Sequence, residues 1–130
     1  MSSAANKMRD YRKIVAWEKA DDLTVLIYNH SKEFPKEEMY ALTSKIRRAA
    51  YSVAANIVEG ASRNTLKDYL HYLFMARGSL AETTYFIHLA HRLVYLSAES
   101  YRLLTSAAEE TGRILTGLIQ SVQAEAGGRV

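Results

Sequence analysis

The strongest constraint on the fold is a long run of regularly spaced residues between positions 66 and 94. Residues predicted to face a neighbour recur there at alternating intervals of four and three: Leu66, Leu70, Leu73, Arg77, Leu80, Thr84, Ile87, His91 and Val94. These intervals place them on one face of an α-helix. Such a helix is ~45 Å long at the standard rise per residue, and it needs partners to be stable in water. The run therefore predicts a bundle of long helices.

Three further helices accompany the long one. Apolar residues at helical spacing indicate them over residues 15–33, 36–59 and 98–123. Pro35, the only proline, separates the first two because it disfavours helix at the residue before it. Gly60 is predicted to be the left-handed cap of the second helix. Thr65 and Ser97 are predicted to cap the third and fourth helices at their N-termini.

Short connections between long amphipathic helices place neighbouring helices antiparallel. We predict an all-α protein, an antiparallel up-down-up-down four-helix bundle over residues 11–123. Flexible segments are expected at residues 1–10 and 124–130. The 130 residues are the length of one ordinary domain, and the 48% hydrophobic content is typical of a globular protein.

The composition excludes several kinds of site. The chain has no cysteine, which excludes disulfides, thiolate metal ligands and a cysteine nucleophile, and fits a reducing cytosol. The first 13 residues contain no apolar segment typical of a secretory signal. No apolar run approaches the ~18 residues needed to span a bilayer. We therefore expect a cytoplasmic protein that does not enter a membrane.

Catalytic patterns are not found. A di-metal bundle site requires Glu-x-x-His pairs, which this chain lacks, and no acid accompanies His88 and His91 on their helix face. No serine lies on a strand-to-helix elbow, and no glycine-rich phosphate loop is present. The prediction is no catalytic residue, no metal, no cofactor and no enzymatic activity.

Polar residues inside the predicted helices suggest close packing. A ladder with spacings of four, four and three runs along the second helix: Arg48, Ser52, Asn56 and Glu59. Small residues surround it, so we interpret it as an inter-helix or inter-subunit network, with a ligand site as the alternative. In the third helix, Gly78 predicts a close helix crossing. Arg77, in the same helix, is predicted to pair with an acidic residue.

The loop from Glu59 to Thr65 has two interpretations. It leads into the N-terminus of the longest helix, where free amides bind anions, and Arg63 could clamp a phosphate or carboxylate there. Alternatively, Gly60 and Thr65 serve only as the caps of the two helices.

A basic stretch without acids is the main functional signal. Between Met39 and Val58 there are three basic residues and no acid. Such patches attract polyanions, but they also occur as ordinary solvated faces. Tyr51 follows the basic residues, and aromatic side chains beside cations can stack on single-stranded bases. Tyrosines at helical spacing are also common at bundle edges.

Two segments carry a family resemblance, S-V-A-A-N-I-V-E-G over residues 52–60 and A-R-G-S-L-A-E over residues 76–82. Together with the segments 16–20, 34–35 and 45–53, they resemble the four-helix bundle family of 23S rRNA intervening-sequence proteins. The accessory variability proteins of diversity-generating retroelements look like relatives. The resemblance covers roughly residues 10–122, and it departs from the family pattern at Lys45 and at Thr83-Thr84.

The resemblance implies a cytoplasmic bacterial homopentamer, a ring of bundles around a central channel. For the retroelement relatives it also implies binding of nucleic acid and of a reverse transcriptase through a basic surface. We therefore expect a non-enzymatic homopentamer that binds RNA or DNA. The candidate contacts are Lys45, Arg47, Arg48, Arg63 and Lys67. Two alternatives are a protein-protein interaction scaffold with no nucleic-acid role, and a small-molecule or metal-dependent enzyme.

Overall fold

The computed structural model describes residues 4–7 and 9–127. Within them lie four long helices and two short 3₁₀ turns, and no strand is formed. The 3₁₀ turns are η1 (Tyr11–Lys13) and η2 (Lys36–Glu38). The helices are α1 (Val15–His30), α2 (Leu42–Ala61), α3 (Leu66–Arg92) and α4 (Ala98–Ala126). The prediction of an all-α, four-helix chain is confirmed.

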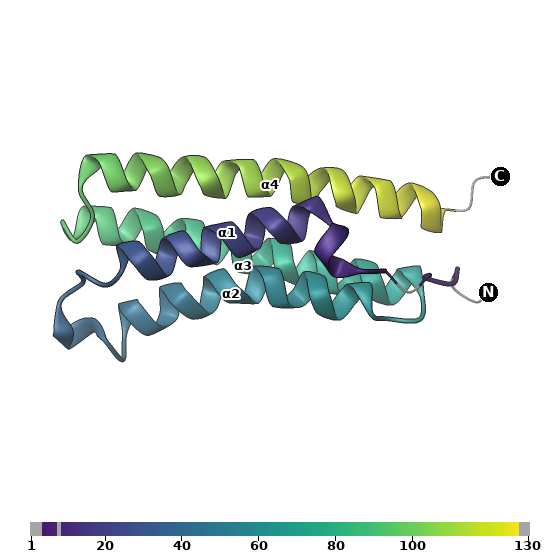
Figure 1. The fold of residues 1–130 in the computed structure, drawn as a ribbon, viewed down its shortest axis with the longest axis horizontal. Helices are drawn as coiled ribbons and strands as arrows, with labels where there is room; N and C mark the ends of the chain where they lie inside the picture. The colour runs from purple at the N-terminus through teal and green to yellow at the C-terminus, as the bar shows by residue number, and fades with distance from the viewer. Residues whose placement is uncertain (1–3, 8, 128–130) are drawn as a thin grey trace.

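The four helices lie side by side along the longest axis of the molecule (Figure 1). α2 packs against α1 and α3, and α4 packs against α3 and α1, so each helix has two neighbours around one core. Large side chains that are completely buried come from every helix, among them Leu23, Ile57, Leu73 and Leu115. Burial of these residues supplies the main stabilising free energy of the fold.

The helix N-termini show how local sequence sets the boundaries. Thr65 Oγ1 accepts a hydrogen bond from the Asp68 amide at 3.1 Å, and Ser97 Oγ accepts one from Ser100 at 3.0 Å, as predicted for both caps. α2, however, begins at Leu42 rather than at residue 36. There a Glu38 carboxylate oxygen accepts the Leu42 amide at 3.2 Å, since residues 36–38 form a separate turn.

Gly60 does not have the predicted left-handed conformation. It lies inside α2, which ends one residue later, and it is buried against α3. A β-carbon at this position would lie 2.9 Å from Tyr69 Cδ1 and 2.9 Å from Tyr72 Cβ. The glycine is needed because α2 and α3 approach each other closely here, not because of its backbone angles.

The left-handed position is taken by Val94 instead, at φ 64°. The Tyr95 amide donates to the Ala90 carbonyl at 2.9 Å, and the Val94 amide donates to His91 at 3.0 Å. This pair of bonds is a Schellman motif, which ends α3 at Arg92. Val94 is 86% exposed, so the prediction that it faces the core is wrong.

The buried face of α3 differs from the prediction at every second position. Leu66, Leu73, Leu80 and Ile87 are buried as expected. Between them, the buried residues lie one place earlier than predicted: Tyr69, Ala76, Thr83 and Ala90. Arg77 and Thr84 are exposed, while Leu70 and His91 are half-buried.

Gly78 and Arg77 also differ from their predicted roles. A β-carbon added at Gly78 would meet nothing within 4 Å, so no close helix crossing occurs there within the chain. The Arg77 guanidinium lies 5.0 Å from the centre of the Phe74 ring, and none of the ion pairs among the described residues involves it. Both residues face away from the core.

An N-terminal strap, residues 4–6, runs along the loop between α2 and α3. The Leu66 amide donates to Ala4 at 2.8 Å, and the Asn6 amide donates to Asn64 at 2.7 Å. Arg9 then pairs with Glu125 near the end of α4 at 3.1 Å. Of the terminal segments predicted to be flexible, residues 1–3, 8 and 128–130 lie outside the described residues, and α4 itself continues to Ala126.

Candidate nucleic-acid interface

The first half of α2 carries three cations on its outer side. Ile46 and Ala49 turn toward the core, which leaves Lys45 and Arg48 exposed to solvent. Arg47 is half-buried; its Nε donates to Ser31 Oγ at 2.8 Å, and its guanidinium lies 4.7 Å from the centre of the Tyr28 ring. None of the three belongs to an ion pair in the described part of the chain. Their charges are therefore available to an external anion.

One hollow beside these cations is rich in tyrosine. It has a volume of about 400 Å³, and it is lined by Tyr28, Met39, Tyr40, Thr43, Ser44, Arg47, Arg48 and Tyr51. Tyr40 is 93% exposed and Tyr51 is 45% exposed. Aromatic rings of this kind, next to guanidinium groups, offer stacking surfaces for bases and charge for phosphates. Met39, at 51% exposed, also lines this hollow.

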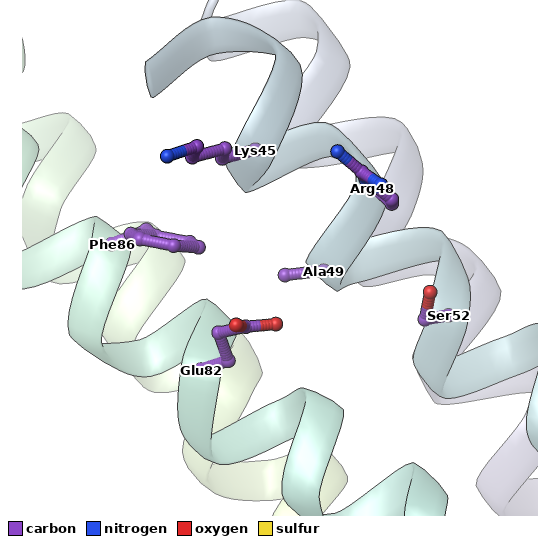
Figure 2. A pocket seen from close by; sticks show the side chains of 6 residues that line it. All are labelled: Lys45, Arg48, Ala49, Ser52, Glu82 and Phe86. Atoms are coloured by element: carbon purple, nitrogen blue, oxygen red, sulfur yellow. The ribbon is translucent and has the colours of Figure 1, made fainter. Parts of the chain in front are cut away.

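A second hollow lies between α2 and α3 (Figure 2). Its volume is about 380 Å³. The lining side chains are Lys45, Arg48, Ala49 and Ser52 from α2, and Glu82 and Phe86 from α3. Figure 2 shows Glu82 pointing from α3 toward α2, on the side where Ala49 lies. Arg48 lines both hollows, so the two adjoin at this residue, and we call their combined lining the α2 basic surface.

The other two candidate residues lie at the opposite end of α2. Arg63 is in the loop that follows α2, and Lys67 is exposed in the first turn of α3. Arg63 donates to Glu59 at 2.9 Å and to the hydroxyl of Tyr72, and its guanidinium lies over the Tyr72 ring. The structure therefore brings Lys45, Arg47 and Arg48 together but leaves Arg63 and Lys67 apart from them.

The loop between α2 and α3 has internal partners for its polar groups. The first amide of α3, at Leu66, donates to the strap, and the amide of Asp68 donates to Thr65. Asn6 is buried; its Nδ2 donates to the Arg63 carbonyl at 2.8 Å, and its Oδ1 accepts from Arg9 Nε at 2.8 Å. The Leu66 and Asp68 amides, which an anion would use at this helix N-terminus, are thus already bonded. This favours the interpretation of Thr65 as a cap, whereas Gly60 lies inside α2 and does not cap it.

The polar ladder of α2 makes its bonds locally. Asn56 Nδ2 donates to the Ser52 carbonyl at 2.8 Å, and Glu59 pairs with Arg63. Arg48 and Glu59 are exposed, whereas Ser52 and Asn56 are half-buried. Among the described residues no hydrogen bond or ion pair joins this ladder to another helix of the bundle, so the inter-helix network is not formed within one chain. The inter-subunit version stays a prediction.

No group of three or more metal-ligating side chains gathers anywhere among residues 4–7 and 9–127. His91 stacks on Tyr101 with ring centres 4.0 Å apart, and His88 is exposed. None of the helices in this part of the chain has the length and apolar character required to cross a membrane.

The comparison with protein families matches residues 12–117 to the 23S rRNA-intervening sequence protein model. The chain belongs to this family. Among solved structures, it is similar to a crystal structure of a protein of unknown function from the S23 ribosomal protein family of Bacteroides thetaiotaomicron, with a TM-score of 0.75 and 24% identity. That similarity covers 82% of this chain and 96% of the other, and shows the shared fold. No curated protein matches, and neither similarity names an enzymatic activity.

Sequence reasoning missed several residues that line the two hollows, among them Glu82 of α3. Tyr28 and Tyr40 come from α1 and from the segment before α2, and Phe86 comes from α3. The spacing of four between Glu82 and Phe86, which places both on one side of α3, was a signal that could have linked them. Their meeting with α2 depends on the helix arrangement.

Proposed function

We propose that this protein is a non-enzymatic, cytoplasmic homopentamer of up-down-up-down bundles that binds RNA or DNA through the α2 basic surface. Lys45, Arg47 and Arg48 contact phosphates, while Tyr40 and Tyr51 stack on bases. The observation that carries the proposal is the set of cations without acid partners next to exposed tyrosines. The phosphate contacts supply affinity, because they release counterions.

An exposed stripe along α3 supports assembly with further copies of the chain. Phe74, Gly78, Ala81 and Tyr85 follow one another at spacings of four, three and four and are all exposed. Exposed apolar side chains in a row are typical of protein-protein contacts. Gly78, with open space around it, allows a helix of a second subunit to approach closely. These features fit a ring in which α3 lies between subunits.

Binding and assembly are tested separately. An electrophoretic shift with a structured RNA is measured at two salt concentrations, and we expect binding that weakens steeply with salt. A control variant with Lys13→Gln and Arg113→Gln removes two exposed positive charges outside both hollows and leaves binding intact. Binding that is absent at low salt, or independent of salt, contradicts the proposal. Light scattering that reports a monomer at micromolar concentration contradicts the pentamer.

The α3 stripe also favours the second candidate, a protein-protein interaction scaffold with no nucleic-acid role. In this version a protein partner, such as a reverse transcriptase, covers the stripe. Capture of one partner that persists after nuclease treatment, together with no RNA or DNA shift, supports the scaffold. Loss of the partner on nuclease treatment supports nucleic-acid binding instead.

A further inference from the structure

The hollow between α2 and α3 contains one carboxylate opposite two cations. Glu82 lines it from α3, and Lys45 and Arg48 line it from α2. Across the described residues, no cation lies within ion-pair distance of Glu82, although the hollow contains two. Figure 2 shows these charged groups around one open space. Such an arrangement suits a ligand with negative charge at one end and hydrogen-bond donors at the other.

The size of the hollow limits the ligand. Its volume of about 380 Å³ lies at the small end of ligand pockets, which span roughly 300–1,000 Å³. One nucleotide fits such a space, whereas two stacked nucleotides do not. Phe86, which packs on the core and lines one wall, offers an aromatic surface for a base.

The chemistry of Glu82 selects among the bases. An ionised carboxylate only accepts hydrogen bonds, and its two oxygens accept two parallel donors best. Guanine presents two neighbouring donors, N1–H and the N2 amino group, on its pairing edge. Adenine and cytosine present one amino group beside a ring acceptor whose lone pair the carboxylate repels, and uracil presents one N–H between two carbonyls. Glu82 therefore favours guanine.

We propose that the α2–α3 hollow binds a guanine nucleotide, with the base edge on Glu82, the ring against Phe86 and the phosphate on Lys45 and Arg48. The Ser52 hydroxyl, on the same wall as Arg48, lies within the hollow to bond the sugar or phosphate. This inference rests on the proposed function, since it names the nucleotide that the α2 basic surface prefers. The nucleotide is either free or part of a single strand, and the test separates the two.

The first arm titrates the full chain with GMP, AMP, CMP and UMP by calorimetry. We expect GMP to bind about tenfold more tightly than the other three. Glu82→Gln replaces one acceptor by a donor, so it weakens GMP binding about tenfold and leaves AMP binding unchanged or stronger. Glu109→Gln, an exposed carboxylate on α4 outside the hollow, is the matched control and retains the GMP preference. Thermal melting verifies that both variants fold.

The second arm compares a labelled 12-nucleotide uridine strand with the same strand carrying one central guanosine. Tighter binding of the guanosine strand, lost in Glu82→Gln, identifies a base within a strand as the ligand. A GMP preference without this gain identifies the free nucleotide. Equal binding of all four mononucleotides and of both strands overturns the guanine inference while the proposed function stands. Absence of binding by both strands and by all four mononucleotides at low salt overturns both.

Discussion

The two ends of α2 carry similar cations in opposite situations. At the start of the helix, Lys45 and Arg48 face open hollows and have no acid partner among the described residues. At its end, Arg63 is bonded to Glu59 and Tyr72, and the strap covers the loop. The difference shows that a basic residue is available for binding only where the fold leaves it without an acid partner.

The packing of α2 against α3 also differs between the two ends of α2. Near Gly60, α2 approaches α3 so closely that a β-carbon would lie 2.9 Å from two tyrosine side chains. Near Ala49, the two helices border a hollow of about 380 Å³. We call the end of α2 near Gly60 the closed end and the end near Ala49 the open end. The closed end fixes the position of α2 on α3, and the open end presents the charged surface.

Gly60→Ala is expected to have the largest effect on stability, because it disrupts the close contact between α2 and α3 at the closed end. The added β-carbon collides with Tyr72 Cβ and with the Tyr69 ring and carbonyl, and overpacking of this kind lowers the free energy of unfolding by about 1–3 kcal/mol. Chemical denaturation at fixed protein concentration measures it. Gly117→Ala, where a β-carbon meets nothing within 4 Å, is the control and gains up to about 1 kcal/mol. Equal effects of the two substitutions would falsify the close contact.

Asn6→Ala detaches the strap from the closed end. It leaves the Arg63 carbonyl and Arg9 Nε without the partners that they have at 2.8 Å. Since Asn6 is buried, we expect a loss of about 1–2 kcal/mol in the free energy of unfolding. Lys7→Ala, the exposed neighbour, serves as the control and changes it by less than about 0.5 kcal/mol. An Asn6 variant as stable as wild type would show that the strap does not stabilise the bundle.

Lys45→Gln combined with Arg48→Gln weakens the open end without disturbing the core. We expect single-stranded RNA to bind about tenfold more weakly, and the slope of log affinity against log salt to become shallower by about 1.4. Fluorescence anisotropy measures both. Arg63→Gln is the matched variant at the closed end. It leaves binding unchanged and lowers stability by less than about 1 kcal/mol, because its ion pair is partly exposed. Weaker RNA binding by Arg63→Gln would contradict the proposed difference between the two ends of α2.

Tyr69→Phe has the smallest effect at neutral pH. The Tyr69 hydroxyl is buried and has no hydrogen-bond partner among the described residues, so its loss changes stability by less than about 1 kcal/mol. Burial raises the pKa of Tyr69 above its ordinary value of 10.0. A raised pKa contributes stability below pH 10 that is lost as the pH rises through the folded-state pKa.

Unfolding of the wild type and of Tyr69→Phe is therefore compared between pH 7 and 11. The variant is expected to lose less stability above pH 10 than the wild type. Tyr40→Phe, an exposed tyrosine, is the control and keeps the wild-type profile. Identical profiles for Tyr69→Phe and wild type would show that the buried phenol does not contribute to the pH dependence.

Much of the helical pattern could be predicted from the spacing of apolar residues. The residues that repeat every seven positions in α3, from Leu66 to Ile87, are buried as expected. The residues between them were assigned one place too late, because positions three and four ahead lie on nearly the same side of a helix. In two of the four pairs the smaller residue takes the buried place, Ala76 rather than Arg77 and Ala90 rather than His91, whereas Tyr69 is buried in place of the smaller Leu70.

The glycines predicted local structure less reliably than the spacing of apolar residues did. Sequence reasoning assigned the left-handed conformation to Gly60 because glycine adopts it without steric cost. The chain uses Gly60 for a close helix contact and places Val94 in the left-handed conformation. Neither outcome could be predicted locally, since both depend on where distant helices lie.

The candidate site was predictable only in its charges. Lys45, Arg47 and Arg48 are consecutive enough to be recognised together, and the structure places them on one surface. Arg63 carried the same signal, but its neighbours Glu59 and Tyr72 determine its role. The aromatic and acidic residues of the two hollows come from other segments, so only the packed bundle brings them to the cations.

The left-handed Val94 has a consequence for the order of folding. This conformation costs a residue with a side chain roughly 1–2 kcal/mol. The adjacent Tyr95 compensates through distant contacts: its ring packs on Phe34 at 5.5 Å between centres, and its hydroxyl donates to Glu38 at 2.8 Å. An isolated pair of α3 and α4 lacks both contacts, so we expect this turn to close after the rate-limiting step. Val94→Gly then slows unfolding and leaves refolding unchanged in stopped-flow measurements, whereas faster refolding would show that the turn closes early.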